Sequence, residues 1–165
     1  MRLFLFLTLP LYALDQLTKI AILRRFEEGD SLTVIEGFFN LVRVHNTGIA
    51  FGSFNDGPAA NIIFTVVALG ALIGIGIFWA RGAFVGALNG TAVALLVAGI
   101  LGNLTDRLWH GYVVDFLDFH ISGKHWPSFN VADSCICIAA GLLFIGAFRA
   151  EPDEGKPPSD KDSGG

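Results

Sequence analysis

Two long runs without a charged residue dominate the sequence, at positions 58–80 and 82–105, and only Arg81 separates them. A helix rises about 1.5 Å per residue, so about 20 apolar residues cross the hydrocarbon core of a bilayer. Each run is long enough to do so. We therefore predict two transmembrane helices joined by a very tight turn at Arg81.

Two further segments predict spanning helices, which brings the number of spans to four. The segment 131–148 is apolar and contains one charge, Asp133, close to its start. At the N-terminus, Arg2 and the apolar run after it resemble a secretory signal, but no small-x-small cleavage site follows. Extending this run to position 23 includes Asp15 and Lys19, four residues apart and able to pair on one helical face. We favour an uncleaved first helix over a removed signal.

Four spans place both termini on one side of the membrane, and the segments 24–57 and 106–130 on the other. Lys and Arg are distributed too evenly over the two sides to fix the orientation. Residues 31–54 are rich in Thr, Val, Ile and Phe with interspersed Gly, which predicts a small hairpin or sheet beside the membrane. The end of the chain is acidic and rich in Pro, Gly and Ser. We therefore predict a membrane domain at 1–150 and a disordered tail at 151–165.

The composition agrees with this fold class, an all-α membrane protein with a small β-sheet region. Hydrophobic residues make up 53% of the chain and charged residues only 16%, which disfavours both a disordered chain and an ordinary water-soluble domain. The net charge of −4 is concentrated in the tail, and nothing indicates a nucleic-acid partner. The two cysteines, Cys135 and Cys137, point to different sides of a helix and predict neither a mutual disulfide nor a metal site.

Ionisable side chains near the bilayer are the candidates for chemistry, because inserting one costs about 2.5–3.5 kcal/mol. Asp115 and Asp133 flank the loop between the third and fourth predicted spans. Two carboxylates in a partly dehydrated site have split pKa values, so that one acts as acid, the other as base, and the pair activates water. Spacing alone leaves a plainer interpretation open, in which each Asp is an interfacial residue or a helix cap. Three more ionisable groups lie at the same membrane end: Asp15, Asp106 and Arg107.

Other functions find less support. The chain has no HExxH zinc-protease motif and no GxSxG nucleophile motif, and its four histidines lack a recognised ligand spacing. A small transporter using Asp15 and Asp133 as an ion or proton relay would need polar residues at mid-membrane depth, where the middle spans offer few. A purely structural membrane subunit would leave the polar cluster unexplained. The tryptophans fit aromatic belts at the two membrane interfaces.

Five motifs, in order and with matching spacing, resemble those of the signal peptidase II family, the bacterial lipoprotein signal peptidases, which are membrane aspartyl proteases. They are DQLTK at 15–19, HNTGIAF at 45–51, GNLTDR at 102–107, VVDF at 113–116 and FNVADS at 129–134. The resemblance covers residues 3–148, with Ile49 at a position where the family more often has Ala. The acidic tail lies outside it.

The resemblance implies a four-helix enzyme of the bacterial inner membrane, with cytoplasmic termini, an extracytoplasmic sheet and an active site near the outer leaflet. The implied substrate is a prolipoprotein whose Cys already carries diacylglycerol, cut just before that Cys. Asp115 and Asp133 fall on the catalytic positions of the family. We expect a monomer that contacts membrane lipids and needs neither a metal nor an organic cofactor. The positions that support the site or contact the substrate are Asp15, Asn46, Gly48, Asn103, Arg107 and Asn130.

Overall fold

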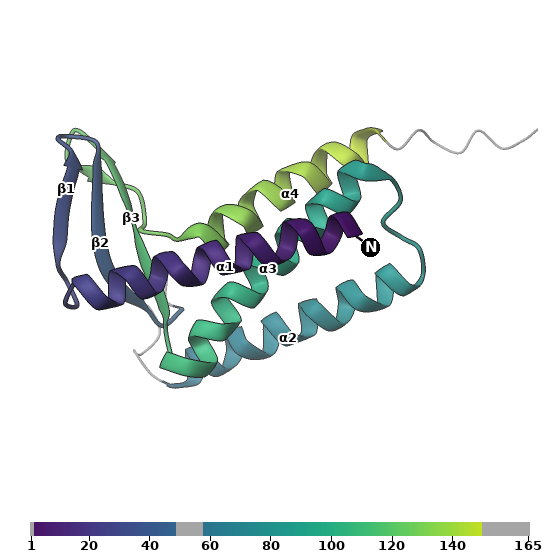
Figure 1. Cartoon of the computed structure of the whole chain (residues 1–165), viewed down its shortest axis with the longest axis horizontal. Helices are drawn as coiled ribbons and strands as arrows, with labels where there is room; N and C mark the ends of the chain where they lie inside the picture. Colours follow the sequence, from purple (N-terminus) through teal and green to yellow (C-terminus); the bar gives the residue numbers. More distant parts are fainter. Residues whose placement is uncertain (1, 49–57, 150–165) are drawn as a thin grey trace, which may run out of the picture.

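Four helices lie alongside one another, and a small antiparallel sheet lies across one end of them (Figure 1). The computed structural model describes residues 2–48 and 58–149. Within these ranges the helices are α1 (Arg2–Arg25), α2 (Pro58–Ala80), α3 (Gly86–His110) and α4 (Val131–Arg149). All four are long and apolar enough to cross a membrane. The predicted fold class and the four predicted spans are confirmed.

The third helix departs from its predicted bounds at both ends. The turn after α2 occupies residues 81–85, so α3 begins later than the predicted position 82. At its other end α3 continues to His110, beyond the predicted limit at 105. It does so because Asp106 is buried and pairs with Lys19 of α1 at 3.0 Å, so that a charge is accommodated inside the bundle.

Helix α3 is the central helix of the bundle. More than half of its span is buried, whereas almost none of α2 is buried, and its apolar surface suits contact with lipid. Both α1 and α4 pack against α3. A Cβ added at Gly102 of α3 would lie 2.5 Å from Asp15 Oδ2 and 3.0 Å from Ala132 Cβ. Glycine at this position therefore lets the polar groups of α1 and the start of α4 come together.

The sheet has four strands, all antiparallel, in the order β1-β2-β3-β4. Strands β1 (Ser31–Ile35) and β2 (Phe39–Asn46) form the hairpin predicted at 31–54, of which positions 49–54 lie outside the described residues. No prediction covers β3 (Val113–Ile121) or β4 (Lys124–His125). Strand β3 pairs with β2 along most of its length, and this pairing places Asp115 opposite Val44 of β2.

An apolar cluster fastens the sheet to the helix bundle. Ile22, near the end of α1, packs with Val114 and Phe116 of β3, and all three side chains are buried. Strand β3 therefore passes directly beside the end of α1, and Asp115 is fixed between two residues of this cluster.

Two smaller predictions have different outcomes. Cys135 is buried in a cluster with Leu95 and Ala139, whereas Cys137 is exposed, so the two thiols lie on different sides of α4 as predicted, and both are free. The predicted disordered tail at 151–165 falls outside the described residues.

Candidate active site

Asp115 lies on β3 with 2% of its surface exposed, and two side-chain amides hold its carboxylate. Asn46, at the end of β2, donates from Nδ2 to Asp115 Oδ2 at 2.9 Å. Asn130, just before α4, donates from Nδ2 to Asp115 Oδ1 at 2.7 Å. The amide of Asn46 is itself oriented, because its Oδ1 accepts the backbone N–H of Gly48 at 2.8 Å. Both oxygens of the carboxylate are thus fixed.

The second carboxylate, Asp133, closes the first turn of α4. Asn130 Oδ1 accepts the backbone N–H of Asp133 at 2.9 Å, and Asp133 Oδ2 accepts the backbone N–H of Asn130 at 3.3 Å. This reciprocal arrangement is a capping box, which satisfies two N–H groups at a helix start. Asn103 of α3 donates from Nδ2 to Asp133 Oδ1 at 2.7 Å. The N-terminus of α4 also stabilises an anion at this position.

Two asparagine amides connect the carboxylates. Asn130 Nδ2, which binds Asp115, also donates to Asn103 Oδ1 at 3.2 Å, and Asn103 in turn binds Asp133. Strand β3 and helices α3 and α4 therefore bring Asp115 and Asp133 into one hydrogen-bonded group. Burial, reinforced by the charge of Asp133, raises the pKa of Asp115 from 3.8 to about 7. A proton can therefore be gained or lost here near neutral pH.

A buried lysine lies behind this group. Lys19 is 1% exposed, and its Nζ lies 2.9 Å from Asp15 Oδ2, 3.0 Å from Asp106 Oδ2 and 3.1 Å from Asn103 Oδ1. The predicted pairing of Asp15 with Lys19 is confirmed. One cation is shared by two buried carboxylates from different helices, which ties α1 to α3 at the level of the site.

The two acidic partners of the lysine also bind the backbone of the neighbouring elements. Asp15 Oδ1 accepts the N–H of Ala132 at 2.8 Å, and Asp106 Oδ2 accepts the N–H of Val114 at 3.0 Å. Each of these N–H groups belongs to the residue just before one of the two aspartates of the site. The Lys19 group therefore sets the positions of both aspartates through the main chain.

Comparisons with known proteins agree on one family. A family model described as Signal peptidase (SPase) II matches residues 7–149. The chain belongs to the signal peptidase II family. The lipoprotein signal peptidase of Ralstonia nicotianae is 50% identical over 137 residues, which cover 82% of this chain and 78% of that protein. The lipoprotein signal peptidase of a Janthinobacterium species is 46% identical over 136 residues, which cover 82% of this chain and 81% of that protein.

A solved structure agrees with this assignment. A bacterial membrane enzyme determined by the in meso method at 2.3 Å resolution is 30% identical to this chain and has a TM-score of 0.81. The match covers 99% of this chain and 96% of that chain. The resemblance drawn from the five motifs is confirmed, and as a signal peptidase II the chain is an aspartic-type protease. The assignment excludes the transporter and structural-subunit alternatives.

Two of the predicted support residues of this signal peptidase II meet at an aromatic ring rather than at the carboxylates. The guanidinium of Arg107 lies over the ring of Phe64, 5.3 Å from its centroid, and Nη1 is 3.5 Å from the backbone oxygen of Asn103. Gly48 approaches the same ring at φ +103°, and a Cβ there would overlap Phe64. The remaining predicted residues, Asp15, Asn46, Asn103 and Asn130, belong to the hydrogen-bonded network of the two aspartates.

Besides Lys19, three contributors to the site go beyond the predicted site residues. Asp106, predicted as an ionisable group at this membrane end and part of the GNLTDR motif, is a partner of Lys19. Gln16 donates from Nε2 to Asp15 Oδ2 at 3.1 Å and to Asp106 Oδ1 at 3.3 Å, and Phe64 supports Arg107. For Gln16 the signal was its place in the DQLTK motif. Within the described ranges, no group of three or more His, Cys, Asp or Glu side chains is arranged to hold a metal ion.

Proposed function

We propose that this signal peptidase II removes the signal peptide from prolipoproteins with Asp115 and Asp133 as its catalytic pair. One observation carries the proposal: two aspartates are joined through asparagine amides, and burial together with the Asp133 charge raises the pKa of Asp115 to about 7. A coupled pair of this kind holds one proton between its two carboxylates near neutral pH. It offers an acid and a base at one site.

The pair hydrolyses the peptide bond in two steps. The ionised carboxylate takes a proton from water as the water oxygen attacks the scissile carbonyl carbon, and the protonated carboxyl donates its proton to the carbonyl oxygen. The result is a tetrahedral gem-diol. In the second step the C–N bond breaks, the leaving nitrogen receives a proton from the pair, and the pair takes a proton from one gem-diol hydroxyl. The two aspartates end with the single proton with which they began.

The amides around the pair hold the reacting oxygens without exchanging protons themselves. Asn46 and Asn130 fix Asp115, and Asn103 fixes Asp133, each at 2.9 Å or less. Because these donors are in place before the substrate arrives, little reorganisation is needed as charge moves between the carboxylates. Lys19 has a positioning role in this proposal, since it acts on the pair through Asn103 and the backbone.

The end of β2 suits an extended peptide. Asn46 lies beside Asp115, and Gly48, two residues further, packs directly against the Phe64 ring, so that β2 ends in an extended segment next to the aspartate. In this proposal the peptide passes these residues while the diacylglycerol on its Cys remains in the membrane, where each buried CH₂ contributes about 0.8 kcal/mol. The lipid then acts as a tether that places the bond before the Cys next to the aspartates.

The proposal includes a location and an orientation. Both termini lie in the cytoplasm, the sheet lies outside the inner membrane, and the site is near the outer leaflet. The arrangement of the fold supports this, because the sheet and the aspartates are at the helix ends far from the N-terminus (Figure 1). A monomer is sufficient in this proposal, since one chain supplies both aspartates and all the amides that bind them.

Cleavage of matched precursors by the purified enzyme in detergent tests the proposal. One precursor carries diacylglycerol on its Cys and the other does not, and mass spectrometry identifies the products. We expect a cut just before the lipidated Cys and little or no cleavage of the unlipidated precursor. Equal rates for the two would refute the tether. We also expect a chelator to leave the rate unchanged, and inhibition that added zinc reverses would contradict the aspartate mechanism.

A further inference from the structure

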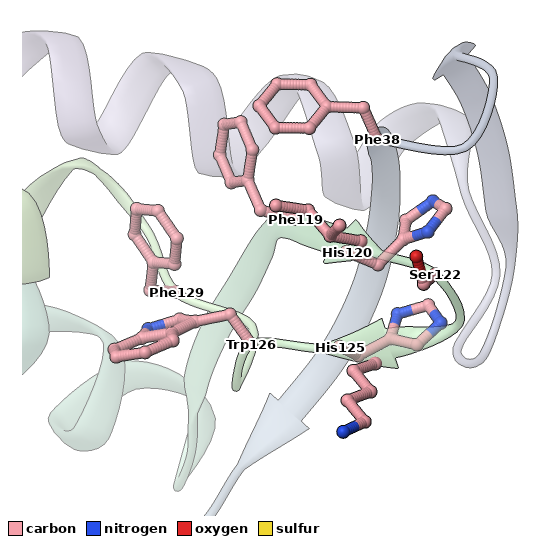
Figure 2. A pocket seen from close by; sticks show the side chains of 9 residues that line it. Phe38, Phe119, His120, Ser122, His125, Trp126 and Phe129 are labelled. Atoms are coloured by element: carbon pink, nitrogen blue, oxygen red, sulfur yellow. The ribbon is translucent and has the colours of Figure 1, made fainter.

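An aromatic groove lies at the opposite end of β3 from Asp115. Four rings line it, those of Phe38, Phe119, Trp126 and Phe129, and its volume is about 770 Å³ (Figure 2). The rings contact one another: Phe119 stacks on Phe129 with centroids 5.8 Å apart and meets Phe38 edge to face at 5.4 Å. The groove is thus formed by packed aromatic side chains.

The apolar wall of this groove continues onto the protein surface. Trp126 is 70% exposed, Ile121 is 67% exposed and Phe38 is 43% exposed. These residues come from β3, from the turn after β1 and from the segment after β4, so the exposed surface is a contiguous patch assembled by the sheet. Patches of this kind on proteins mark contacts with another apolar phase or partner.

The polar edge of the groove is basic. Lys124 and His125 of β4 line it, together with His120. The carboxylate beside His125 is that of Asp118, which is 6% exposed: Asn40 Nδ2 donates to it at 2.8 Å, and His125 Nδ1 lies 2.8 Å from its Oδ1. Within the described residues Lys124 forms no salt bridge, and Asp118 is buried beneath Asn40 and His125, so the Lys124 ammonium group is free to meet an anionic group.

The position of the groove relative to the membrane indicates what kind of molecule it binds. Phe129 lies two residues before the start of α4, and its backbone is hydrogen-bonded to that of Leu117 of β3. The groove therefore lies at the level where the helices leave the membrane. Aromatic rings beside Lys at this level match the boundary between acyl chains and phosphate groups.

We propose that this groove binds a membrane phospholipid, with one acyl chain against the four aromatic rings and the phosphate beside Lys124 and His125. The basic edge favours a phospholipid over a neutral diacylglycerol group, which has no anion to place there. The lipid holds the outer part of the sheet on the bilayer surface.

Tryptophan fluorescence of the full chain in nanodiscs tests this proposal. The chain has three tryptophans, so replacing Trp79 and Trp109 by Phe leaves Trp126 as the reporter. We expect phosphatidylcholine with brominated acyl chains to quench Trp126, and aqueous iodide to leave it largely unquenched. Efficient quenching by iodide with no effect of the brominated chains would overturn the proposal, as it would mean a groove filled by water or by another partner.

A second measurement compares the wild type with variants that each carry a single substitution. Native mass spectrometry counts the lipids retained by enzyme extracted from mixed bilayers of phosphatidylcholine and phosphatidylglycerol. We expect the wild type to retain phosphatidylglycerol preferentially and Lys124→Gln to reduce that preference, whereas Arg81→Gln, which removes a charge at the far end of α2, does not. Equal losses in both variants, or no loss in Lys124→Gln, would overturn the assignment of the phosphate to this edge.

Discussion

The two ends of β3 differ in what surrounds them, although each contains an Asp-Phe pair. The stretch VVDF is buried by α1 and the start of α4, and the oxygens of its aspartate accept hydrogen bonds from two asparagines. The stretch DFHI projects beyond the helices, and its apolar side chains line an open groove. The same kind of strand thus produces a closed polar site where helices cover it and an apolar contact surface where they do not.

The pKa values of the two aspartates of β3, Asp115 and Asp118, shift in opposite directions. Burial and the Asp133 charge raise the pKa of Asp115 to about 7. Burial also raises the pKa of Asp118, but hydrogen bonds from Asn40 and His125, together with charge interactions with His125 and His120, outweigh it, so that its pKa lies below the ordinary value. Asp118 is therefore an anion at neutral pH. A like charge nearby and the exclusion of water are needed to make a carboxylate that exchanges protons at neutral pH.

The largest expected effect follows from replacing the aspartates of the site. Asp115→Asn and Asp133→Asn should each lower the rate of precursor cleavage by at least about 10²-fold, because an amide keeps the size of the group but cannot transfer the proton. The measurement is single-turnover cleavage in detergent, with circular dichroism to verify folding. Asp118→Asn is the matched control on the same strand and should retain most of the activity. An active Asp115→Asn or Asp133→Asn enzyme would refute the pair.

The next expected effect concerns stability. Lys19→Met should lower the free energy of unfolding by about 3–5 kcal/mol, because it leaves two buried carboxylates without their cation. Lys124→Met, in the exposed region of the same sheet, should change it by less than about 0.5 kcal/mol. Thermal unfolding in a fixed detergent compares the two variants. Similar small losses in both would mean that the Lys19 group does not hold the helices together.

The pH dependence of cleavage should follow Asp115. Its pKa of about 7 lies above that of an ordinary carboxyl, so the proton needed by the pair is present below about pH 7 and is lost above it. The rate should then fall up to about tenfold per pH unit on the alkaline side. Burial lowers the pKa of His45, so this histidine titrates on the acid side of its usual range. His45→Gln should leave the fall of the rate above about pH 7 unchanged. If this fall disappeared in His45→Gln, it would have to be assigned to His45 instead of Asp115.

The smallest expected effect concerns Arg107. Arg107→Lys should slow cleavage several-fold despite keeping the charge, because an ammonium cannot reproduce the planar guanidinium stacked over Phe64. The ratio of kcat to KM for the lipidated precursor is the quantity to compare, with Arg107→Ala as the reference for complete loss. If Arg107→Lys were fully active and Arg107→Ala inactive, only the charge would matter.

The sequence predicts the parts of the fold that depend on length and local pattern. The spans follow from apolar runs, and the β1–β2 hairpin follows from β-branched residues between glycines. It misses β3 because residues 113–116 are buried on both faces and do not alternate, so the pattern gives no period of two. The sequence-based prediction also ends α3 too early, because a charged residue such as Asp106 indicates the end of a membrane span unless its partner Lys19 on α1 is known.

For the candidate site, too, the sequence predicts some features, whereas others depend on contacts between distant segments. Topology alone gathers the ionisable groups at one membrane end, and the motifs assign Asp115 and Asp133 to the catalytic positions. What bridges them is set by packing between distant segments: Asn103 reaches from α3 to α4, and Asp15 reaches from α1 to the backbone of Ala132. Such contacts depend on how the helices pack, and the spacing of residues along one helix does not predict them.

The capping box at the start of α4 couples the reaction to the main chain. The oxygen of Asp133 that accepts the N–H of Asn130 belongs to a carboxylate that the proposed reaction uses. Any ligand that draws this carboxylate toward itself competes with that N–H. Deuterium exchange at the Asn130 amide of the unaltered enzyme should therefore change when an inhibitor resembling the gem-diol is bound, so that a backbone amide reports the occupancy of the active site.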